Sequence, residues 1–313
     1  MKLKKPRFWD YKKPNFISYL LLPFTFPLII NNFFLKLKKN STNNFKIKKI
    51  CVGNIYVGGT AKTPLTIKIY QILNSLKFKT ATIKKFYANH IDEQKMLTEK
   101  TKLYCLKDRN TALDKAIKDN NDVVIFDDGL QDKSINYDLE FVCFNNIKFI
   151  GNGLLIPAGP LREKIESIKK YDAVFINGNE VDNSYLKSLI KKYNKNIKIF
   201  ESNYSPINIK EFDINERYFI FSGIGNPESF KEILMKNKLN IIKEIIFPDH
   251  YNYTQKDIDE IKTQAKKLNA TIITTEKDYT KINSDNYDDI KFLQIDLKIK
   301  NEIELINYLK LNI

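Results

Sequence analysis

The segment from Val52 to Pro64 restricts the possible folds of this chain more than any other segment. It reads V-G-N-I-Y-V-G-G-T-A-K-T-P, follows an apolar, β-branched stretch and opens a helical pattern that continues to about Leu76. A glycine-rich turn between a strand and a helix points several backbone N–H groups and a helix N-terminus at one place, which suits a bound phosphate. The segment therefore predicts a phosphate-binding loop, or P-loop, in a sheet whose strands are joined by helices.

The residues of this loop have distinct expected roles. Lys62 would neutralise the terminal phosphates of a nucleotide, and the Thr63 hydroxyl would ligate Mg²⁺. Ala61 stands where the usual motif has glycine, a change that costs about 1–2 kcal/mol if this residue must adopt a left-handed backbone. The residues expected to surround the phosphates of ATP are Gly53, Asn54, Gly58, Gly59, Thr60, Ala61, Lys62 and Thr63.

Two adjacent carboxylates form a second candidate site. Asp127 and Asp128 end the apolar stretch that begins at Val123, and Gly129 follows them. Adjacent carboxylates repel each other, and a bound divalent cation removes that penalty. Because they follow the P-loop in the chain and stand at the carboxyl end of an expected strand, we expect them to hold Mg²⁺ beside the nucleotide.

From Phe45 onward, short β-branched stretches alternate with amphipathic helical stretches. This alternation predicts an α/β fold with a mostly parallel, P-loop-type sheet and flanking helices. We predict a P-loop domain over residues 41–208 and a second, smaller α/β domain over 209–313, with the junction within 203–213. The expected strands cover residues 47–52, 80–83, 122–126, 139–144, 173–176, 197–201, 217–221, 243–247, 270–274 and 291–294.

Residues 1–40 form a separate segment that we expect to associate with a membrane surface. A nearly uncharged stretch from Phe16 to Leu35 lies between lysine-rich flanks, and Pro23 and Pro27 interrupt its helical hydrogen bonds. A broken helix in the membrane interface, a true span and an apolar helix packed on the protein body all remain open. The basic flanks and the aromatic residues favour the interfacial helix, and no cleavage site indicates a signal peptide.

The charge and the rare residues exclude several classes of function. The formal net charge is +15, from 52 Lys and Arg against 37 Asp and Glu. Such an excess suits an anionic membrane or a phosphorylated substrate, although a general bias toward lysine gives the same charge. We expect no nucleic-acid partner, because no motif for one accompanies the charge. Three isolated cysteines and two histidines exclude a disulfide framework and a Cys/His zinc site.

Together these motifs make the chain resemble the tetraacyldisaccharide 4'-kinase family, the lipid A 4'-kinases of Gram-negative bacteria. The resemblance covers nearly the whole chain, and its motifs occur in the order of the family. They are Val52-Gly53-Asn54 leading into Gly58-Gly59-Thr60, D-D-G-L-Q at 127–131, G-N-G-L-L-I-P-A-G-P-L-R-E at 151–163, G-I-G-N-P at 223–227, F-P-D-H at 247–250 and T-T-E-K-D at 274–278.

The resemblance implies transfer of the γ-phosphoryl group of ATP to the 4'-hydroxyl of a tetraacylated glucosamine disaccharide 1-phosphate, a late step of lipid A biosynthesis. It implies ATP and Mg²⁺ as cofactors, an acylated disaccharide lipid as substrate and a location at the cytoplasmic face of the bacterial inner membrane. It also implies two α/β domains around a cleft, the second closing over the nucleotide. We expect a monomer.

The resemblance also assigns roles to individual residues. Asp92, in the segment His90-Ile91-Asp92-Glu93-Gln94, matches the catalytic aspartate of the family and would accept the proton of the sugar hydroxyl, with His250 orienting it or sharing its proton. Arg162 and Glu163 would contact substrate, nucleotide phosphate or metal, and a structural salt bridge remains an alternative. Residues expected to bind substrate are Gln131, Arg162 and Glu163, and further ATP contacts are expected from Gly225, Asn226, Thr275 and Lys277.

The chain departs from the family pattern at three places. The family segment S-R-G-Y-G-R is replaced by residues 83–89, where a basic residue remains at Lys85 without the bidentate fork of arginine, and Asp132 stands where histidine is common. Ala61 is the third departure. A slow or altered enzyme therefore remains conceivable, as do a membrane-bound P-loop ATPase switch and a catalytically weakened lipid-binding relative.

Overall fold

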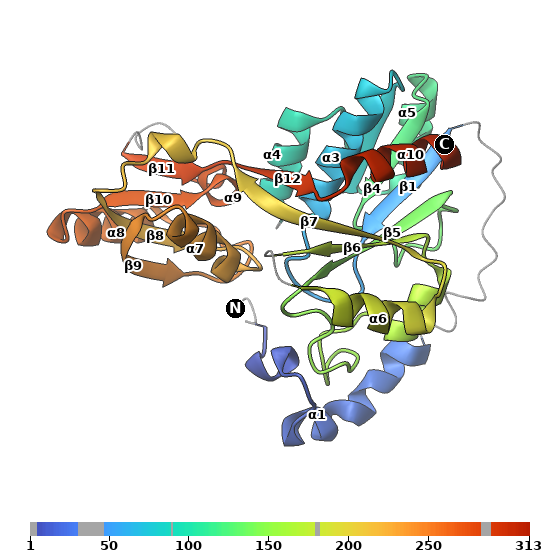
Figure 1. The fold of residues 1–313 in the computed structure, drawn as a ribbon, viewed down its shortest axis with the longest axis horizontal. Coiled ribbons are helices and arrows are strands. Elements are labelled where there is room, and N and C mark those ends of the chain that lie inside the picture. The colour runs from blue at the N-terminus through green and yellow to red at the C-terminus, as the bar shows by residue number, and fades with distance from the viewer. Residues whose placement is uncertain (1–4, 31–46, 89, 179–181, 283–288) are drawn as a thin grey trace.

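The computed structural model describes residues 5–30, 47–88, 90–178, 182–282 and 289–313 (Figure 1). Its strands form one large and one small sheet. The strands are β1 Lys48–Gly53, β2 Thr80–Lys85, β3 Leu103–Leu106, β4 Val123–Asp127, β5 Leu139–Asn145, β6 Ala173–Asn177, β7 Lys198–Pro206, β8 Arg217–Ser222, β9 Asn240–Ile246, β10 Thr271–Thr275, β11 Ile290–Leu293 and β12 Ile295–Ile299.

The large sheet places the predicted motifs along one edge. Its strand order is β12-β7-β6-β5-β1-β4-β2-β3, and every neighbouring pair is parallel except β12 with β7. The chain changes direction across the sheet at β1, because β4, β2 and β3 lie on one side of it and β5, β6 and β7 on the other. In such sheets the carboxyl ends of the strands at this point form the ligand crevice. The P-loop follows β1 and Asp127 ends β4, with Val52 opposite Asp127 in the register.

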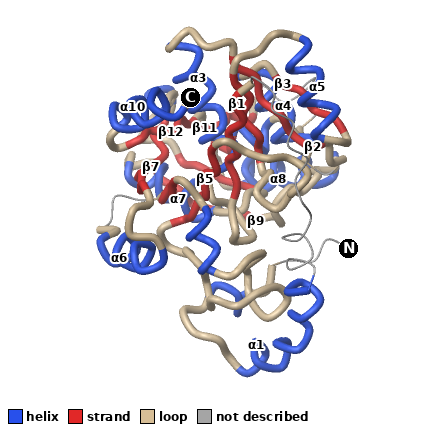
Figure 2. Tube along the Cα trace, turned by 90° about the vertical axis from the view of Figure 1, so that its right-hand side faces the viewer, coloured by secondary structure: helices blue, strands red, loops and turns tan. Residues whose placement is uncertain are grey.

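Helices cover both sheets on both faces. Figure 2 shows the strands inside a shell of helices. The described helices of the body are α3 Lys62–Ser75, α4 Ile91–Lys100, α5 Arg109–Lys118, α6 Ser184–Tyr193, α7 Pro227–Lys236, α8 Gln255–Lys267, α9 Glu276–Tyr279 and α10 Glu302–Asn312.

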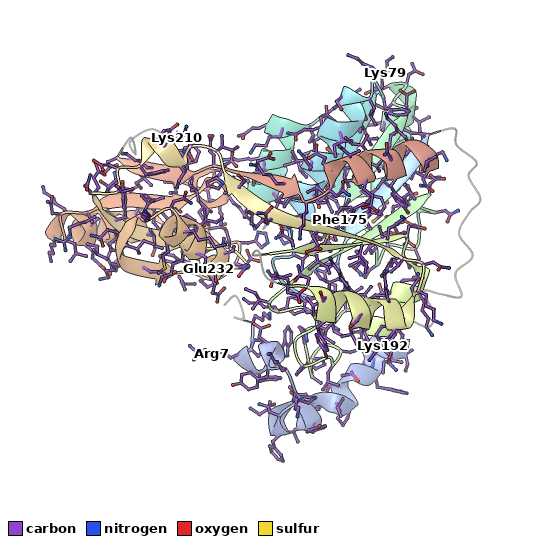
Figure 3. All side chains as sticks on the ribbon, viewed as in Figure 1. Arg7, Lys79, Phe175, Lys192, Lys210 and Glu232 are labelled. Carbon is purple, nitrogen blue, oxygen red and sulfur yellow. The ribbon has the colours of Figure 1, made fainter. Side chains whose placement is uncertain are left out.

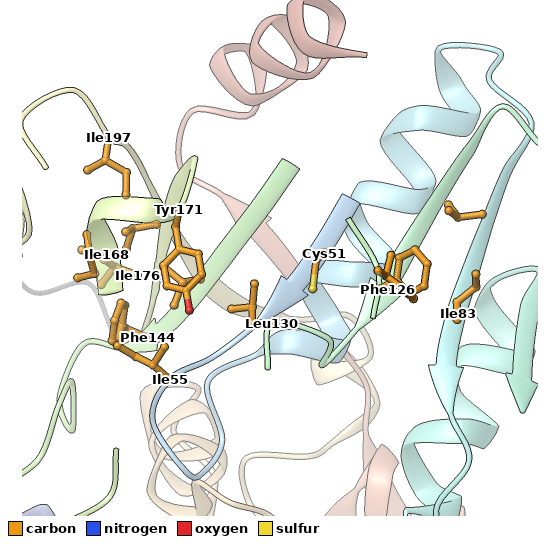
Figure 4. Close-up of a cluster of buried hydrophobic side chains, with 14 of the residues drawn as sticks. Cys51, Ile55, Ile83, Phe126, Leu130, Phe144, Ile168, Tyr171, Ile176 and Ile197 are labelled. Carbon is orange, nitrogen blue, oxygen red and sulfur yellow. The ribbon is translucent and has the colours of Figure 1, made fainter. Parts of the chain in front are cut away.

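The two faces of the large sheet bury separate cores. Ile50 and Val52 of β1 point into the core under α3 and α10. Cys51 points into the other core, under α5 and α6, and Figure 4 shows this second core. A strand buried on both faces tends to have a run of consecutive apolar residues, and in β1 this run covers residues 50–52. Phe175 lies inside the molecule, while Lys79 projects from its surface (Figure 3).

The small sheet has the order β11-β10-β8-β9 and is parallel throughout. Phe230 and Leu234 of α7 pack on one of its faces, and Ile258 and Ile261 of α8 pack on the other. β7 and β12 run as an antiparallel pair from the large domain toward the small one (Figure 1). The predicted α/β class, with a second smaller domain, is confirmed.

The structure corrects the predicted boundaries. All ten expected strands are present, but β3 and β12 were not predicted, and β7 extends to Pro206 inside the expected junction. The predicted grouping of residues 209–313 is wrong for its last part, because β12 pairs with β7 in the large sheet and α10 packs beside α3. This pairing joins segments distant in the sequence, so no local pattern indicates it.

The N-terminal segment lies on the loop 151–162 of the large domain. Its described elements are η1 Arg7–Asp10, α1 Phe16–Leu21, η2 Leu22–Thr25 and a helical stretch over 26–30. The helix breaks at the turn containing Pro23, as predicted. The Asn152 amide donates to the buried Ser18 hydroxyl, at 2.9 Å, and the Trp9 indole donates to the Pro157 carbonyl, also at 2.9 Å.

The outer surface of this segment is apolar and exposed. Within the described part of the chain, no helix combines the length and the apolar character needed to cross a bilayer. Residues 31–40 of the predicted membrane-associated segment, including its second lysine flank, lie outside the described residues. The exposed side chains include Phe16, which is 80% exposed, and also Ile17, Tyr19, Leu20, Phe24, Phe26, Ile29 and Ile30.

Candidate active site

The P-loop is organised around a buried asparagine. The Asn54 side chain is fully buried, and its amide donates to the carbonyls of Tyr56 and Gly58 and to the Thr60 hydroxyl, at 2.6, 3.3 and 3.0 Å. The Asn54 amide nitrogen therefore fixes the shape of the loop, whereas the buried Oδ1 of the same side chain has no hydrogen-bond partner in the described part of the chain. The Gln131 amide donates to the Asn54 carbonyl, at 3.1 Å, and ties the loop to the segment after β4.

The loop ends in a strained residue at the start of α3. Ala61 is the N-cap of α3 and has φ 66° and ψ 26°, a left-handed conformation. This is the geometry for which the usual motif has glycine, so the cost of alanine anticipated above does arise here. No acidic residue stands in the first turn of α3. The positive end of the helix dipole at Lys62 and Thr63 is thus open to an anion.

Positive φ angles mark the site. Of the eight described non-glycine residues with positive φ, four (Lys77, Asn120, Lys238 and Asn269) lie just past helix C-termini, where this conformation is usual. Three of the remaining four are Ala61, Asp128 and His250, all predicted site residues. Backbone strain that no helix end explains is typical of functional sites, where surrounding structure holds it in place.

Asp127 and Thr63 meet as predicted. The Thr63 hydroxyl donates to Oδ2 of Asp127 at 3.0 Å, and Asp127 is fully buried. The Lys84 ammonium, on the neighbouring strand β2, lies 2.6 Å from the same oxygen and 2.7 Å from Oε2 of Glu93. Burial alone would lower the pKa of Lys84, but the carboxylates of Asp127 and Glu93 outweigh it and hold that pKa above its ordinary value.

Asp128 points toward two other cations. The Lys62 ammonium lies 3.9 Å from Oδ2 and the Arg162 guanidinium 3.0 Å from Oδ1. Burial favours the neutral acid, but Lys62 and Arg162 outweigh it and lower the pKa of Asp128 to about 2. The carboxylate is therefore charged at neutral pH.

The predicted substrate residues form one hydrogen-bonded group beside Asp128. Arg162 donates to Oε1 of Gln131 at 3.2 Å, and the Gln131 amide donates to Oε1 of Glu163 at 3.0 Å. Glu163 also accepts from Lys170 at 2.6 Å and from the Tyr171 hydroxyl at 3.2 Å. No salt bridge between Arg162 and Glu163 is among the ion pairs of the described residues, since each pairs with another partner.

The predicted pair of Asp92 and His250 also meets, across the two domains. Nδ1 of His250 lies 3.1 and 3.0 Å from the two carboxylate oxygens of Asp92, which is 1% exposed. Nε2 of His250 lies 3.8 Å from Oε1 of Glu93. Burial raises the pKa of Asp92, but the hydrogen bond from His250 and the charge of Lys277 outweigh it and hold the pKa well below its ordinary range.

The lysines of the small domain complete this cluster. Nζ of Lys277 lies 3.4 Å from Asp92, 3.4 Å from Asp249 and 3.7 Å from Glu93, and Nζ of Lys281 lies 3.5 Å from Asp92. Lys277 was expected to contact ATP, and here its ammonium faces three carboxylates. Those carboxylates outweigh burial and raise its pKa above the ordinary value.

The remaining predicted ATP contacts lie at two different places. A Cβ on Gly59 would lie 3.2 Å from the backbone nitrogen of Asn226, and one on Gly225 only 2.6 Å from that of Gly59. The P-loop thus touches the small domain at this point, and glycine is needed on both sides. Thr275 instead caps α9, because its hydroxyl accepts the Asp278 N–H and donates to the Asp278 carboxylate.

A cavity of about 300 Å³ opens beside this contact. One wall consists of the carboxyl ends of β5, β6 and β7, with Asn145, Asn177 and Tyr204. The other wall is the first part of α7 in the small domain, with Asn226 and Ile233. The cavity therefore continues the crevice edge from the P-loop along the large sheet.

Sequence reasoning missed residues whose partners come from other elements. Lys84, for which no role was predicted, reaches Asp127, while Lys85 lies over the Tyr87 ring. Glu93 was inside the H-I-D-E-Q segment, and only its neighbour was assigned a role. Asp132 pairs with Arg109 at 2.9 Å, and Arg109 donates to the Asp128 carbonyl at 2.6 Å.

Comparisons with known proteins agree with the motifs. Residues 18–312 match the model of the family described as tetraacyldisaccharide-1-P 4'-kinase. A protein named tetraacyldisaccharide 4'-kinase from Pelagibacter ubique (strain HTCC1062) is 53% identical over 314 residues, covering 100% of this chain and 99% of that protein. A protein of the same name from Rickettsia bellii (strain OSU 85-389) is 35% identical over 320 residues, covering 96% of each.

A solved structure shares the fold. The crystal structure of LpxK from Aquifex aeolicus in complex with ATP has a TM-score of 0.68 and 20% identity, covering 95% of this chain and 99% of that chain. The family match spans nearly the whole length, and two curated relatives exceed 30% identity over nearly all of this chain. The resemblance inferred from the motifs is confirmed: this chain belongs to the tetraacyldisaccharide 4'-kinase family.

Proposed function

We propose that this chain transfers the γ-phosphoryl group of ATP to the 4'-hydroxyl of a tetraacylated glucosamine disaccharide 1-phosphate, at the cytoplasmic face of the bacterial inner membrane. One observation supports the roles that we assign to individual residues. A phosphate loop, an acidic corner and a carboxylate–imidazole pair converge at one edge of the large sheet. Phosphoryl transfer needs these three parts, because its catalysis consists mainly of positioning and charge stabilisation. Both domains of one chain supply them, so a monomer is sufficient.

The triphosphate would lie along the P-loop and the N-terminus of α3. Lys62 is available for this role because its partner in the structure, Asp128, is 3.9 Å away and also held by Arg162. A phosphate oxygen would compete with Asp128 for the Lys62 ammonium. It would also accept hydrogen bonds from the N–H groups of the first turn of α3. Lys62 would remain close to the γ-phosphoryl group during transfer and offset the developing charge on its oxygens.

The donor set at the acidic corner fits Mg²⁺. The Thr63 hydroxyl and the Asp127 carboxylate lie 3.0 Å apart, and the second carboxylate is that of the adjacent Asp128. Mg²⁺ prefers oxygen ligands, and one or two carboxylates together with phosphates and water are its usual set. When bound there, the ion would neutralise charge on the β- and γ-phosphates. Lys84, whose ammonium lies 2.6 Å from Asp127, would hold that carboxylate in place.

The nucleoside of ATP would occupy the cavity between the strand ends and α7. The cavity begins where Asn226 meets Gly59, so a ligand whose phosphates follow the P-loop reaches it directly. Replacing Ile233 by tryptophan should fill it and weaken ATP binding by about tenfold or more, without changing the affinity for inorganic tripolyphosphate. Met235→Trp, on the exposed side of the same helix, is the matched control. Equal losses for ATP and tripolyphosphate would place the nucleoside elsewhere.

The acceptor hydroxyl would approach the Asp92–His250 pair. The pair can take up one proton, and the buried, hydrogen-bonded carboxylate holds the imidazole in a fixed orientation, as in other carboxylate–histidine catalytic pairs. Arg162 ends the loop 151–162 on which the N-terminal segment lies, and together with Gln131 and Glu163 it would bind an anionic or hydroxyl group of the lipid. The exposed apolar side chains of the N-terminal segment would enter the membrane beside this site.

The direct test is phosphorylation of the lipid in mixed detergent micelles. Purified protein with ATP, Mg²⁺ and the tetraacyl disaccharide 1-phosphate should produce a bis-phosphorylated lipid, detected by mass spectrometry. Lys62→Ala should abolish turnover while leaving the unfolding transition nearly unchanged, since the role of Lys62 is charge stabilisation. No product in several detergents, or full activity of Lys62→Ala, would refute the proposal.

A further inference from the structure

The two histidines of the chain stack on each other across the two domains. The ring centroids of His90 and His250 are 4.3 Å apart, and the ring planes differ by 7°. His90 is the N-cap of α4 in the large domain, and His250 follows β9 in the small domain. The chain has no other histidine, so every histidine signal of the protein belongs to this stack.

The stack limits how the His250 ring can turn. Nδ1 of His250 faces Asp92, while Nε2 lies 3.8 Å from both Glu93 and Asp249. Its backbone is held as well, because its N–H donates to the Gly223 carbonyl at 3.1 Å with φ at 56°. The stack therefore restrains the plane of the His250 ring, and the contact of Nδ1 with Asp92 selects which edge of the ring faces that carboxylate.

The surroundings of the stack favour a neutral His90. Burial lowers the pKa of His90, and the neighbouring imidazole of His250 lowers it further, against the opposite effect of Glu93. Lys84 also lowers it and Asp92 raises it. The Tyr87 ring lies 5.3 Å from that of His90.

The groups facing His250 are more strongly anionic. They are Asp92 and Glu93 from α4, Asp249 from its own loop, and Lys277 from α9, which pairs with these carboxylates. On His250, Nδ1 lies 3.1 and 3.0 Å from the two carboxylate oxygens of Asp92. On His90, the nearest carboxylate oxygen, Oε2 of Glu93, is 3.8 Å from Nδ1.

We propose that His90 is a positioning residue for phosphoryl transfer: its stacked ring holds the plane of the His250 imidazole while Nδ1 faces Asp92, ready to take part in removing the hydroxyl proton of the acceptor. This inference rests on the proposed function, because it needs the Asp92–His250 pair to handle that proton. His90 itself does not touch the reacting atoms. It acts through the orientation of its neighbour.

The kinetic test compares two replacements of His90. His90→Phe keeps a flat ring for stacking and removes the titratable nitrogens, whereas His90→Ala removes the ring. We expect His90→Ala to lower kcat by about tenfold or more while the KM for ATP stays within about twofold. His90→Phe should restore at least half of the lost rate. A kcat that is unchanged in His90→Ala, or that falls equally in both variants, would overturn the proposal.

The second test detects the stacked histidine rings by NMR, without measuring activity. In protein labelled with ¹⁵N-histidine, the Nδ1 and Nε2 signals of His250 should be distinct in the wild type and in His90→Phe, and should move toward each other in His90→Ala as the ring gains freedom. His250→Gln should raise the pKa of His90, because the repulsion between the two rings is lost. Independent titration of the two rings would contradict the stack. An intact stack in a protein without kinase activity would refute the proposed function alone.

Discussion

At the residue scale, Ala61 shows how the site differs from the usual phosphate-binding motif. A left-handed alanine costs about 1–2 kcal/mol relative to glycine, while the methyl group gains up to about 0.8 kcal/mol because it is 8% exposed in the core under α3. The chain thus keeps a small net strain at the start of α3, the helix proposed to receive the phosphates. The loop remains formed because Asn54 holds it from inside.

This balance predicts that Ala61→Gly does not destabilise the protein. We expect the free energy of unfolding, measured with urea, to rise by up to about 1 kcal/mol. Ala112→Gly is the matched control, because Ala112 lies in the interior of α5, where the same change costs about 1 kcal/mol or more. A loss of 1 kcal/mol in Ala61→Gly would show that the left-handed conformation carries no strain.

At the element scale, a buried lysine joins three elements. Lys84 of β2 connects Asp127 at the end of β4 with Glu93 on α4, at 2.6 and 2.7 Å, and its side chain is 3% exposed. Through Glu93 the same contacts reach His250 and Lys277 of the small domain. The acidic corner and the carboxylate–imidazole pair are therefore parts of one electrostatic network.

Removing this lysine should be costly. Lys84→Met leaves two buried carboxylates without their shared cation, and we expect a loss of about 3 kcal/mol or more in the free energy of unfolding at neutral pH. Adding Glu93→Gln to Lys84→Met should recover part of the lost free energy of unfolding, because only one of the two carboxylates then remains without Lys84. Lys85→Met, at the next position of the strand, should change stability by less than about 0.5 kcal/mol. Equal effects of Lys84→Met and Lys85→Met would contradict the network.

Elements with a local signal could be predicted from the sequence. β4 is a continuous apolar stretch that ends in Asp127, and β1 contains the apolar run 50–52 before Gly53, so both the strands and the residues at their ends were recognisable. β3 was missed because it has only four residues, all half-buried. β12 and Lys84 were missed for another reason. Their importance lies in a pairing with a distant strand or helix, which one sequence does not display.

At the scale of the whole molecule, the site lies between two domains that touch at several points. The P-loop meets the small domain at Gly59 and Gly225, and α4 meets α9 through an ion pair of Lys100 with Glu276 at 2.7 Å. A domain that moved away would open the cavity and separate Asp92 from His250. The N-terminal segment packs on the loop that leads to Arg162, because Leu28 packs against the cluster of Leu155 and Leu161 and the Trp9 indole donates to the Pro157 carbonyl, and this loop connects the proposed membrane surface to the site.

Membrane association can be tested separately from catalysis. Replacing Phe16, Leu20 and Phe24 together by serine removes three exposed apolar side chains, and should lower binding to anionic lipid vesicles by about tenfold or more in a flotation assay. The control replaces Ile303 and Leu311, which are equally exposed on α10, by serine and should bind like the wild type. Equal binding of all three proteins would mean that the N-terminal segment is not the membrane contact.

The central claim is that the Asp92–His250 pair performs the proton transfer at a site where ATP is held by other residues. The most direct measurement is the single-turnover rate of Asp92→Asn with the lipid acceptor, together with its affinity for ATP. We predict a rate lower by about 10²–10⁴-fold with an ATP affinity within about twofold of the wild type. An unchanged rate, or a loss of ATP affinity that accounts for the whole decrease, would contradict the account.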